Sequence, residues 1–201
     1  MIYNYPYKSQ ELAGVFGSGI RKGNIDIEYE ALISPIYNNG LNYGVNNCFD
    51  GDPSTFCTSQ DNKNSKVHYL QIMFKKLKFI IKGFAILNRD CCWNPMKYVI
   101  QGSSDGNNFK NISIKDEPDS VCSTKSVRTY QIDYSNDRFS YIRLLSTGMS
   151  CNKQADIYTF NMAEFDLFGN FITDSHYCRS LNRRRIQTPQ FWYYAIVLIV
   201  K

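Results

Sequence analysis

The amino-acid sequence predicts an all-β domain, specifically an antiparallel β-sandwich of the jelly-roll type. Tyr and Phe, which favour strands, number 15 and 13 in 201 residues. Short runs of alternating apolar and polar residues recur along the chain, separated by stretches rich in Asn, Asp, Gly and Pro. Closely spaced strands without intervening helices pair as antiparallel hairpins, and about eight of them close best as two packed sheets.

The predicted elements divide the chain into three parts. Residues 1–24 form an N-terminal lead-in, in which one short helix is expected near Ser9–Phe16. Residues 25–169 form the sandwich domain, and residues 170–201 form a tail. The expected strands lie at 25–29, 70–74, 80–86, 98–100, 109–114, 127–132, 139–145 and 160–168.

The net charge of +5 comes from the tail. The last 26 residues contain five of the 23 Lys and Arg residues and none of the 18 acidic residues, so residues 1–175 are neutral overall. We therefore expect no nucleic-acid partner. The tail continues into ten apolar residues at 191–200, which as a helix reach roughly 15 Å of the about 30 Å that a bilayer requires. Such a tail suits contact with a membrane surface, an unstructured end or an added strand.

The seven cysteines do not form a metal-binding pattern. No C-x-x-C motif occurs, and the adjacent pair Cys91-Cys92 cannot ligate zinc tetrahedrally with neighbours at the usual spacing. The N-terminus lacks the basic segment and apolar run of a signal peptide. Reduced thiols and a cytoplasmic location are therefore the default expectation, with the membrane periphery or the cell surface as alternatives.

Three segments carry the residues of chemical interest. The loop 46–55 combines two carboxylates, a hydroxyl and several carbonyls, which are the oxygen ligands that calcium prefers. It does not fit a calcium-binding helix-loop-helix, and it is equally well explained as a turn in which Asp50 and Asp52 bond backbone amides. Asp105-Gly106 predicts a hairpin turn. Glu164 lies among apolar neighbours, where a buried carboxylate needs a cation.

These segments, in this order, resemble the coagulation factor 5/8 type C, or discoidin, domain, which belongs with the galactose-binding-like carbohydrate-binding modules. The resemblance covers roughly residues 25–169 and rests on four matching stretches: Asp50-Gly51-Asp52 with Thr55 and then Tyr69-Leu70-Gln71-Ile72; Tyr98 to Phe109 around Gly102-Ser103-Ser104-Asp105-Gly106; Tyr141-Ile142-Arg143-Leu144; and Ala163-Glu164 with Gly169. The sequence departs from the family pattern at Cys57, Met73 and Ser140, changes that a core can accommodate by repacking.

The resemblance implies a sandwich without a catalytic centre and with a structural calcium ion. The ion would be held by the side chains of Asp50, Thr55 and Glu164 and by backbone carbonyls. The carbonyls would be those of Asn47, Asp52 and Ala163. Calcium would then join the loop to the last strand and stabilise the fold.

Ligands of this family are recognised by loops at one end of the sandwich, where an aromatic ring stacks on a sugar and polar side chains bond its hydroxyls. Trp93, flanked by Arg89 and Asn94, is the expected stacking residue here, although it can equally cover the core. His68 and Tyr158 are further ligand-binding candidates; His68 is otherwise simply a residue at a strand end.

We therefore expect a noncatalytic binding module with a lectin-like or cell-adhesion role, whose partner is a galactose-type glycan or a glycoprotein. The alternatives are an intracellular protein-protein interaction module and a phospholipid or membrane-surface binder. An enzyme is not expected, because the sequence lacks nucleophile-elbow, phosphate-loop and dinucleotide-binding motifs and has two histidines. A Cys–His pair involving His68 is the remaining enzymatic alternative.

Overall fold

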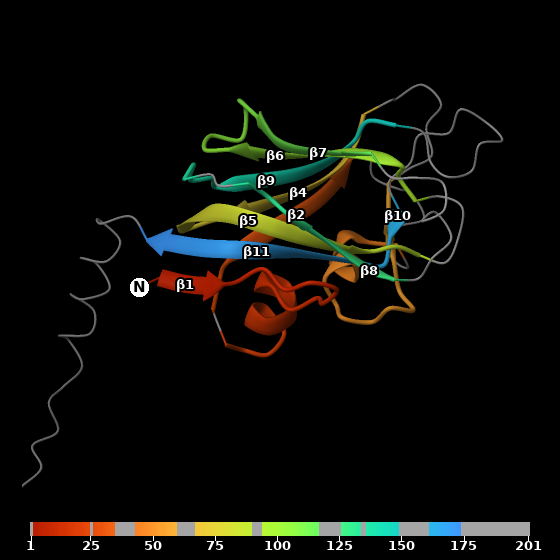
Figure 1. Cartoon of the computed structure of the whole chain (residues 1–201), viewed down its shortest axis with the longest axis horizontal. Helices are drawn as coiled ribbons and strands as arrows, with labels where there is room; N and C mark the ends of the chain where they lie inside the picture. The colour runs from red at the N-terminus through yellow and green to blue at the C-terminus, as the bar shows by residue number, and fades with distance from the viewer. Residues whose placement is uncertain are drawn as a thin grey trace, which may run out of the picture.

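Two antiparallel β-sheets pack face to face in the computed structural model (Figure 1). The structure describes residues 2–24, 26–34, 43–59, 67–89, 94–116, 126–133, 136–148 and 161–173. One sheet has four strands in the order β1-β11-β5-β8, and the other has five in the order β2-β4-β9-β6-β7. A short pairing of β10 with β3 lies at the end of the sandwich away from the N-terminus. The predicted β-sandwich is confirmed.

The bounds of the elements are as follows. The first sheet contains β1 (Ile2–Tyr5), β11 (Glu164–Thr173), β5 (Leu77–Leu87) and β8 (Val127–Gln131). The second contains β2 (Tyr29–Ser34), β4 (His68–Phe74), β9 (Tyr141–Ser146), β6 (Lys97–Ser103) and β7 (Lys110–Asp116). The remaining elements are β3 (Cys57–Thr58), β10 (Asn161–Met162), the π-helix η1 (Val15–Ile20) and the 3₁₀-helix η2 (Val45–Cys48).

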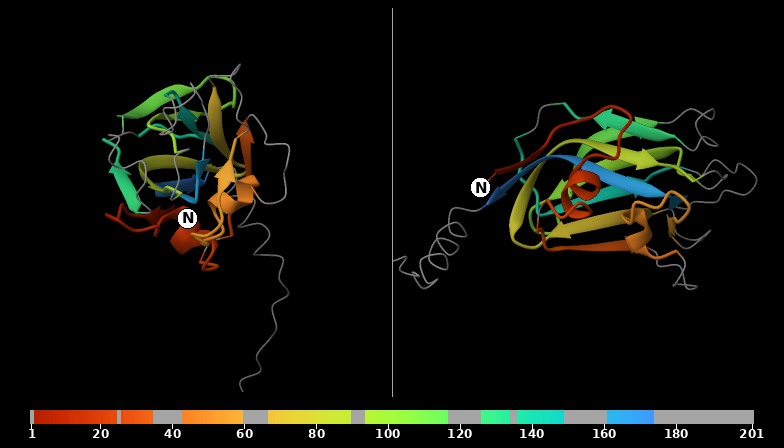
Figure 2. Two further views of the ribbon diagram at one scale, coloured as in Figure 1. Left: turned by 90° about the vertical axis from the view of Figure 1, so that its right-hand side faces the viewer. Right: turned by 90° about the horizontal axis from the view of Figure 1, so that it is seen from below.

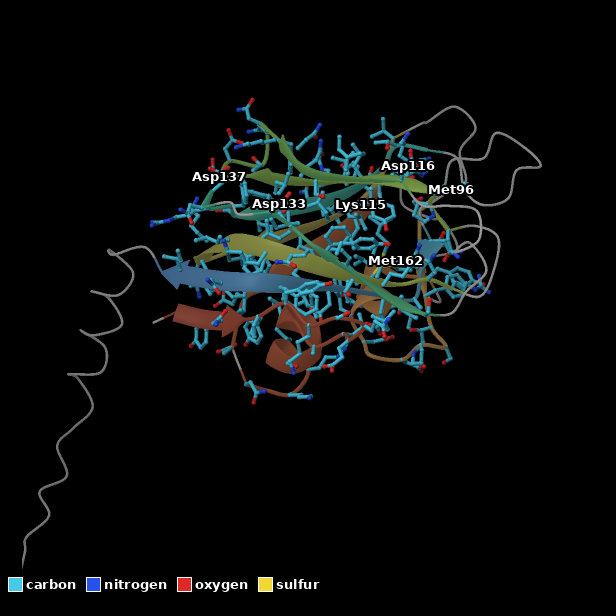
Figure 3. The ribbon with its side chains drawn as sticks, viewed as in Figure 1. Met96, Lys115, Asp116, Asp133, Asp137 and Met162 are labelled. Carbon is cyan, nitrogen blue, oxygen red and sulfur yellow. A yellow bond between two sulfur atoms is a disulfide. The ribbon has the colours of Figure 1, made fainter. Side chains whose placement is uncertain are left out.

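The core lies between the two sheets, whose ribbons face each other in the end-on view of Figure 2. Figure 3 adds the side chains in the view of Figure 1. Strand β4 alternates between buried and half-buried positions, because one of its faces points into the sandwich and the other points outward. Phe74 from β4 meets Phe171 from β11 with ring centroids 4.9 Å apart, and Phe79 from β5 lies 4.7 Å from the same ring. Fully burying each such ring contributes about 1.5–3 kcal/mol.

The N-terminal segment belongs to the sandwich and is more than a lead-in. Strand β1 pairs with β11, and Val15 and Phe16 of η1 are fully buried in the core. The helix expected near residues 9–16 is wrong in position: residues 9–14 are not helical, and a π-helical segment covers Val15–Ile20 instead. The periodicity of residues 1–24 could not reveal this, because β1 is only four residues long and its partner lies more than 160 residues away.

The C-terminal strand also extends beyond the predicted domain boundary at residue 169. Strand β11 continues to Thr173, and residues 174–201 lie outside the described part of the chain. A bulge interrupts its pairing with β5 between Phe168 and Gly169. Gly169 has φ +155°, and a Cβ there would lie 2.1 Å from the Ile80 carbonyl, so only glycine fits. Among the described helices, none is long and apolar enough to cross a membrane.

Two cysteines depart from the default expectation of reduced thiols. Cys48, at the end of η2, and Cys57, at the start of β3, form a disulfide, and both residues are fully buried. Sequence reasoning could not assign this bond, because seven cysteines allow many pairings. Cys91, Cys92, Cys122, Cys151 and Cys178 lie outside the described residues.

Candidate functional site

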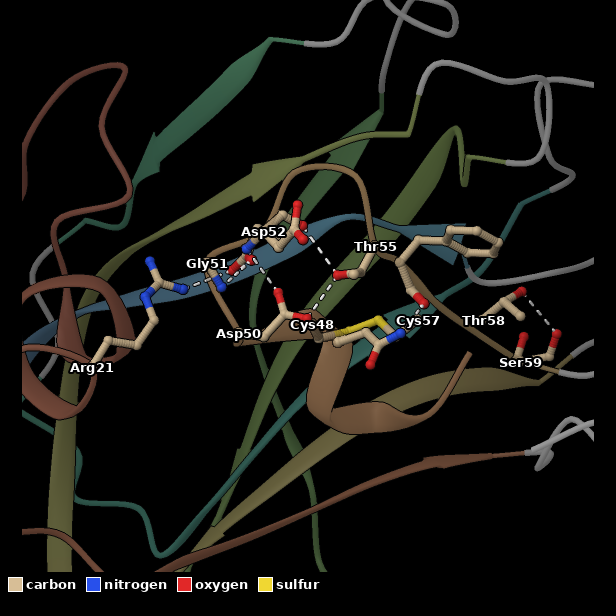
Figure 4. The surroundings of a disulfide bond; sticks show 12 residues. Arg21, Cys48, Asp50, Gly51, Asp52, Thr55, Cys57, Thr58 and Ser59 are labelled. Carbon is tan, nitrogen blue, oxygen red and sulfur yellow. Dashed lines mark hydrogen bonds and ion pairs between the residues drawn. A yellow bond between two sulfur atoms is a disulfide. The ribbon is translucent and has the colours of Figure 1, made fainter. Parts of the chain in front are cut away.

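The loop between η2 and β3 is folded by its own carboxylates and closed by the Cys48–Cys57 disulfide (Figure 4). Asp50 accepts the backbone N–H of Asp52 at 2.8 Å on Oδ1 and the hydroxyl of Thr55 at 2.7 Å on Oδ2. Gly51, between the two carboxylates, has φ +82°, a conformation that favours glycine. The turn that the sequence offered as an alternative to a calcium loop is therefore present.

Glu164, the first residue of β11, contacts this loop, and only 1% of its surface is exposed. Its Oε1 accepts the N–H of Gly51 at 2.5 Å, and its Oε2 accepts a hydrogen bond from the Arg21 guanidinium at 2.8 Å. Burial raises the pKa of Glu164 to about 7; the Asp50 carboxyl also raises it, while Arg21 and the Gly51 N–H oppose the shift. The buried carboxylate does have a positive partner, and this partner is a side chain.

Three predicted calcium-binding side chains and the predicted Asp52 carbonyl lie together at the loop. The side chains of Asp50, Thr55 and Glu164 meet at the loop, as expected. The Asp52 carbonyl accepts the backbone N–H and the hydroxyl of Thr55, at 3.1 and 3.0 Å. Asn47 donates its amide to the Phe56 carbonyl at 3.1 Å, and Ala163 donates its N–H to the Leu87 carbonyl at 2.8 Å.

This arrangement does not fit a calcium ion well. Both carboxylate oxygens of Glu164 already accept N–H groups, and one of the donors carries a positive charge. The calcium site therefore stays a prediction, and the position of Arg21 argues against it.

Arg21 is the site residue that sequence reasoning missed. It is separated from Glu164 by 143 residues, and it lies in the segment that we expected to be a lead-in. The need of Glu164 for a cation was predictable from its apolar neighbours. The identity of the cation was not predictable, because no local sequence pattern links Arg21 with Glu164.

At the end of the sandwich where β5 ends, Arg89 is held against an aromatic ring. Its guanidinium carbon lies 3.6 Å from the centroid of the Phe56 ring, and the Phe56 ring packs on Tyr43 with centroids 4.6 Å apart. Asn94 is buried, and its side-chain amide donates to the Arg89 carbonyl at 2.9 Å. Phe56 belongs to the loop that Glu164 and Arg21 contact, so this loop also supports Arg89.

The other predicted ligand-binding residues differ in their placement. His68 is fully buried, and its Nδ1 shares a 2.7 Å hydrogen bond with the Ser59 hydroxyl, so it has no surface with which to touch a ligand. Trp93 and Tyr158 lie outside the described residues. Of the three predicted residues that the structure describes, Arg89 is therefore the one that lies at a loop end with part of its side chain accessible.

A groove of about 670 Å³ lies elsewhere, on the outer face of the five-stranded sheet. Gln71 and Met73 of β4 and Tyr141 of β9 contribute to its lining. Arg143 lies beside it, between the rings of Tyr69 and Phe109. Arg89, Asn94 and His68, the predicted ligand-binding residues that the structure describes, do not line this groove.

The two packed antiparallel sheets define a β-sandwich domain. The F5/8 type C domain family matches residues 33–152, more than half of the chain, and the chain belongs to this family. The resemblance identified from the sequence motifs is thereby confirmed. No curated protein matches the sequence significantly.

Solved structures with the same fold include three bacterial domains. CBM32-3 from a family 31 glycoside hydrolase of Clostridium perfringens has a TM-score of 0.56 at 17% identity, covering 70% of this chain and 90% of that one. The family 32 CBM from C. perfringens NanJ, in complex with galactose, has a TM-score of 0.53 at 14% identity, covering 70% and 93%. The F5/8 type C domain of a Bacteroides fragilis protein has a TM-score of 0.52 at 13% identity, covering 76% and 99%.

Proposed function

We propose that this chain is a noncatalytic carbohydrate-binding module that recognises a galactose-type glycan through the loops beside Arg89. Its membership of the F5/8 type C family supports a binding role. Two structures that share its fold were solved with sugars, galactose for the NanJ module and GalNAc-β-1,3-galactose for CpGH89CBM32-5, a C. perfringens module. A shared fold does not determine a ligand, so the proposal depends on the site itself.

The observation that carries the proposal is the stacking of Arg89 on Phe56. A guanidinium lying 3.6 Å over a ring directs its N–H groups sideways within its own plane, where they can donate to hydroxyls. The Asn94 amide fixes the backbone of Arg89 through its carbonyl. The arginine is therefore held in place before a ligand arrives, which reduces the entropy lost on binding.

Trp93 supplies the second element of the proposed site. It precedes Asn94 directly, in the short connection between β5 and β6 that also contains Arg89. An indole ring is suited to stack on the apolar C–H face of a galactose ring while Arg89 donates to the hydroxyls. We leave His68 out of the proposed site because it is buried.

The test is a glycan array probed with the full chain, the Arg89→Ala and Trp93→Ala variants, and Arg138→Ala as a control that removes an exposed arginine elsewhere. We expect selective binding to galactose-terminated glycans, a loss of at least about tenfold in affinity for the first two variants, and no change for the control. A Phe56→Leu variant should weaken binding by a smaller factor, because it keeps an apolar side chain at this position but removes the ring beneath Arg89.

Two results would overturn the proposal. The first is glycan binding that is equal in the wild type, Arg89→Ala and Trp93→Ala. The second is an array without binding when the sample is folded, which would favour a protein or phospholipid partner instead. Liposome binding with and without residues 176–201 then separates a membrane partner from a protein partner.

We also propose that the module works in an oxidising compartment, where galactose-type glycans would be met on cell surfaces. The support is the Cys48–Cys57 disulfide, since such bonds persist outside the reducing cytosol. Thiol titration of the denatured protein, purified without reductant from its natural source, tests this. Blocked Cys48 and Cys57 are expected, whereas two free thiols would contradict the proposal.

A further inference from the structure

We propose that Arg21 is the resident cation of this domain: its guanidinium, and no metal ion, holds the loop 48–57 to β11. The proposal rests on three contacts that one side chain makes with two segments far from it in sequence. Those segments are the disulfide-closed loop, through Phe49 and Gly51, and the start of β11, through Glu164.

Arg21 connects the loop 48–57 with the start of β11. Its Nη1 donates to the Phe49 carbonyl at 3.1 Å and to Glu164 Oε2 at 2.8 Å. Its stem lies over the glycine at the top of the loop, where a Cβ on Gly51 would be 3.0 Å from the Arg21 Nε. Arg21 thereby joins the loop to the last strand, the connection that we expected a calcium ion to make.

The charges support the same assignment. The side chain of Glu164 is 1% exposed and that of Arg21 is 24% exposed, so their ion pair is shielded from water on the carboxylate side. Removing one partner from such a pair leaves a buried charge without compensation, which strongly destabilises a protein. Whenever the Glu164 carboxyl is charged, the folded domain therefore depends on a positive charge at this position, and Arg21 provides it.

A calcium ion at the predicted site would compete with Arg21 for one oxygen atom, Glu164 Oε2. Calcium needs six to eight oxygen ligands at 2.3–2.6 Å. Glu164 Oε2 faces the guanidinium and Oε1 faces the Gly51 N–H, and neither donor can ligate a cation. A divalent ion bound to Glu164 would also lie next to the positive charge of Arg21. The domain should consequently fold and keep Phe56 beneath Arg89 in the absence of calcium.

The first experiment needs no variant. The melting temperature of the full chain is measured in excess calcium and in excess EGTA, and terbium luminescence reports any site for a calcium-like ion. We expect the same melting temperature in both solutions and no saturable terbium signal. A melting temperature that falls in EGTA, together with saturable terbium binding, would show that the site takes a metal and would overturn the proposal.

The second experiment removes the guanidinium. Arg21→Met keeps a long apolar stem, and Lys22→Ala is the matched control, because it removes a positive charge from the adjacent, exposed residue. We expect the melting temperature of Arg21→Met to fall by roughly 5–10 °C, with little change for Lys22→Ala. Adding Glu164→Gln to Arg21→Met should recover part of the loss, because the unpaired buried charge disappears. Equal melting temperatures for Arg21→Met and Lys22→Ala would contradict the proposed role.

Discussion

The carboxylate of Asp166 accepts the backbone N–H of Gly14 at 2.8 Å and so joins two segments 152 residues apart. It also accepts the N–H groups of Phe16, Gly17 and Leu167, at 2.8–3.1 Å. Burial raises the pKa of Asp166, and these N–H bonds oppose the shift by favouring the charged form. One side chain of β11 thereby fixes the entry of η1, which carries Val15 and Phe16 into the core.

Replacing Asp166 with Asn should destabilise the domain by about 2–4 kcal/mol, because an amide keeps one acceptor oxygen and brings an N–H₂ group against backbone donors. Urea unfolding measures the change. Asp133→Asn is the control, since Asp133 is exposed, and it should change the free energy of unfolding by less than about 0.5 kcal/mol. Similar losses for both variants would argue against the anchoring role of Asp166.

Replacing Gly14 with Ala should destabilise the domain by about 3 kcal/mol or more, because a Cβ at this position would lie 2.1 Å from the Leu167 carbonyl oxygen. Gly23→Ala is the comparison. A Cβ at Gly23 meets nothing within 4 Å, but φ is +66°, so backbone strain alone should cost about 1 kcal/mol. Unfolding curves of the two variants separate the cost of a steric clash from the cost of backbone strain. If Gly14→Ala lost no more unfolding free energy than Gly23→Ala, the β11 backbone would be able to move away from η1 easily.

The stability of the domain should depend on pH through Glu164. Its pKa is about 7 in the folded protein and about 4.5 in the unfolded chain, so the folded state binds more protons between these values. The contribution of Glu164 therefore favours folding below pH 4.5 and is lost as the pH rises towards 7, by at most about 3 kcal/mol.

The difference in unfolding free energy between the wild type and Glu164→Gln, measured in EGTA from pH 4.5 to 8, reports this contribution. We expect the advantage of the wild type over the variant to shrink as the pH rises. Glu11→Gln, at an exposed glutamate, is the control variant. A flat difference for Glu164→Gln would show that its carboxyl titrates at an ordinary value.

Removing the disulfide with Cys48→Ser and Cys57→Ser together should lower the free energy of unfolding by about 2–3 kcal/mol, because the bond closes a loop whose ends are nine residues apart. Thermal unfolding of the wild type with and without reductant checks the same bond without a substitution. Reductant should lower the melting temperature of the wild type and leave the double variant unchanged. A response of the double variant to reductant would point to a different disulfide.

The sequence motifs were sufficient to identify the family. The alternating pattern of β4 and the Asp105-Gly106 turn were sufficient to predict an antiparallel sandwich. Asp105 accepts N–H groups from Asn107 and Asn108 in this turn, both at 2.9 Å, as a local motif should. The loop around Asp50 likewise folds through contacts between residues that are close in sequence. Such features are predictable because their partners lie within a few residues.

The candidate site was predicted less completely. Asp50, Thr55 and Glu164 were expected together and are found together, whereas Arg21 was missed and His68 proved to be buried. Burial of a strand-end histidine depends on what packs over the strand, and one sequence contains no direct information on that packing. The calcium ion and the sugar stay predictions that the experiments above test.

Alternation, turn chemistry and the family motifs were enough to predict the fold class and the family, and the energetic penalty of a buried carboxylate was enough to predict that Glu164 needs a positive partner. The identity of that partner, the pairing of the cysteines and the contribution of residues 2–20 to the sandwich depend on contacts that form in the folded chain. The physical reason is the distance along the chain: Arg21 with Glu164, and Gly14 with Asp166, are brought together by the packing of β11 against the N-terminal segment.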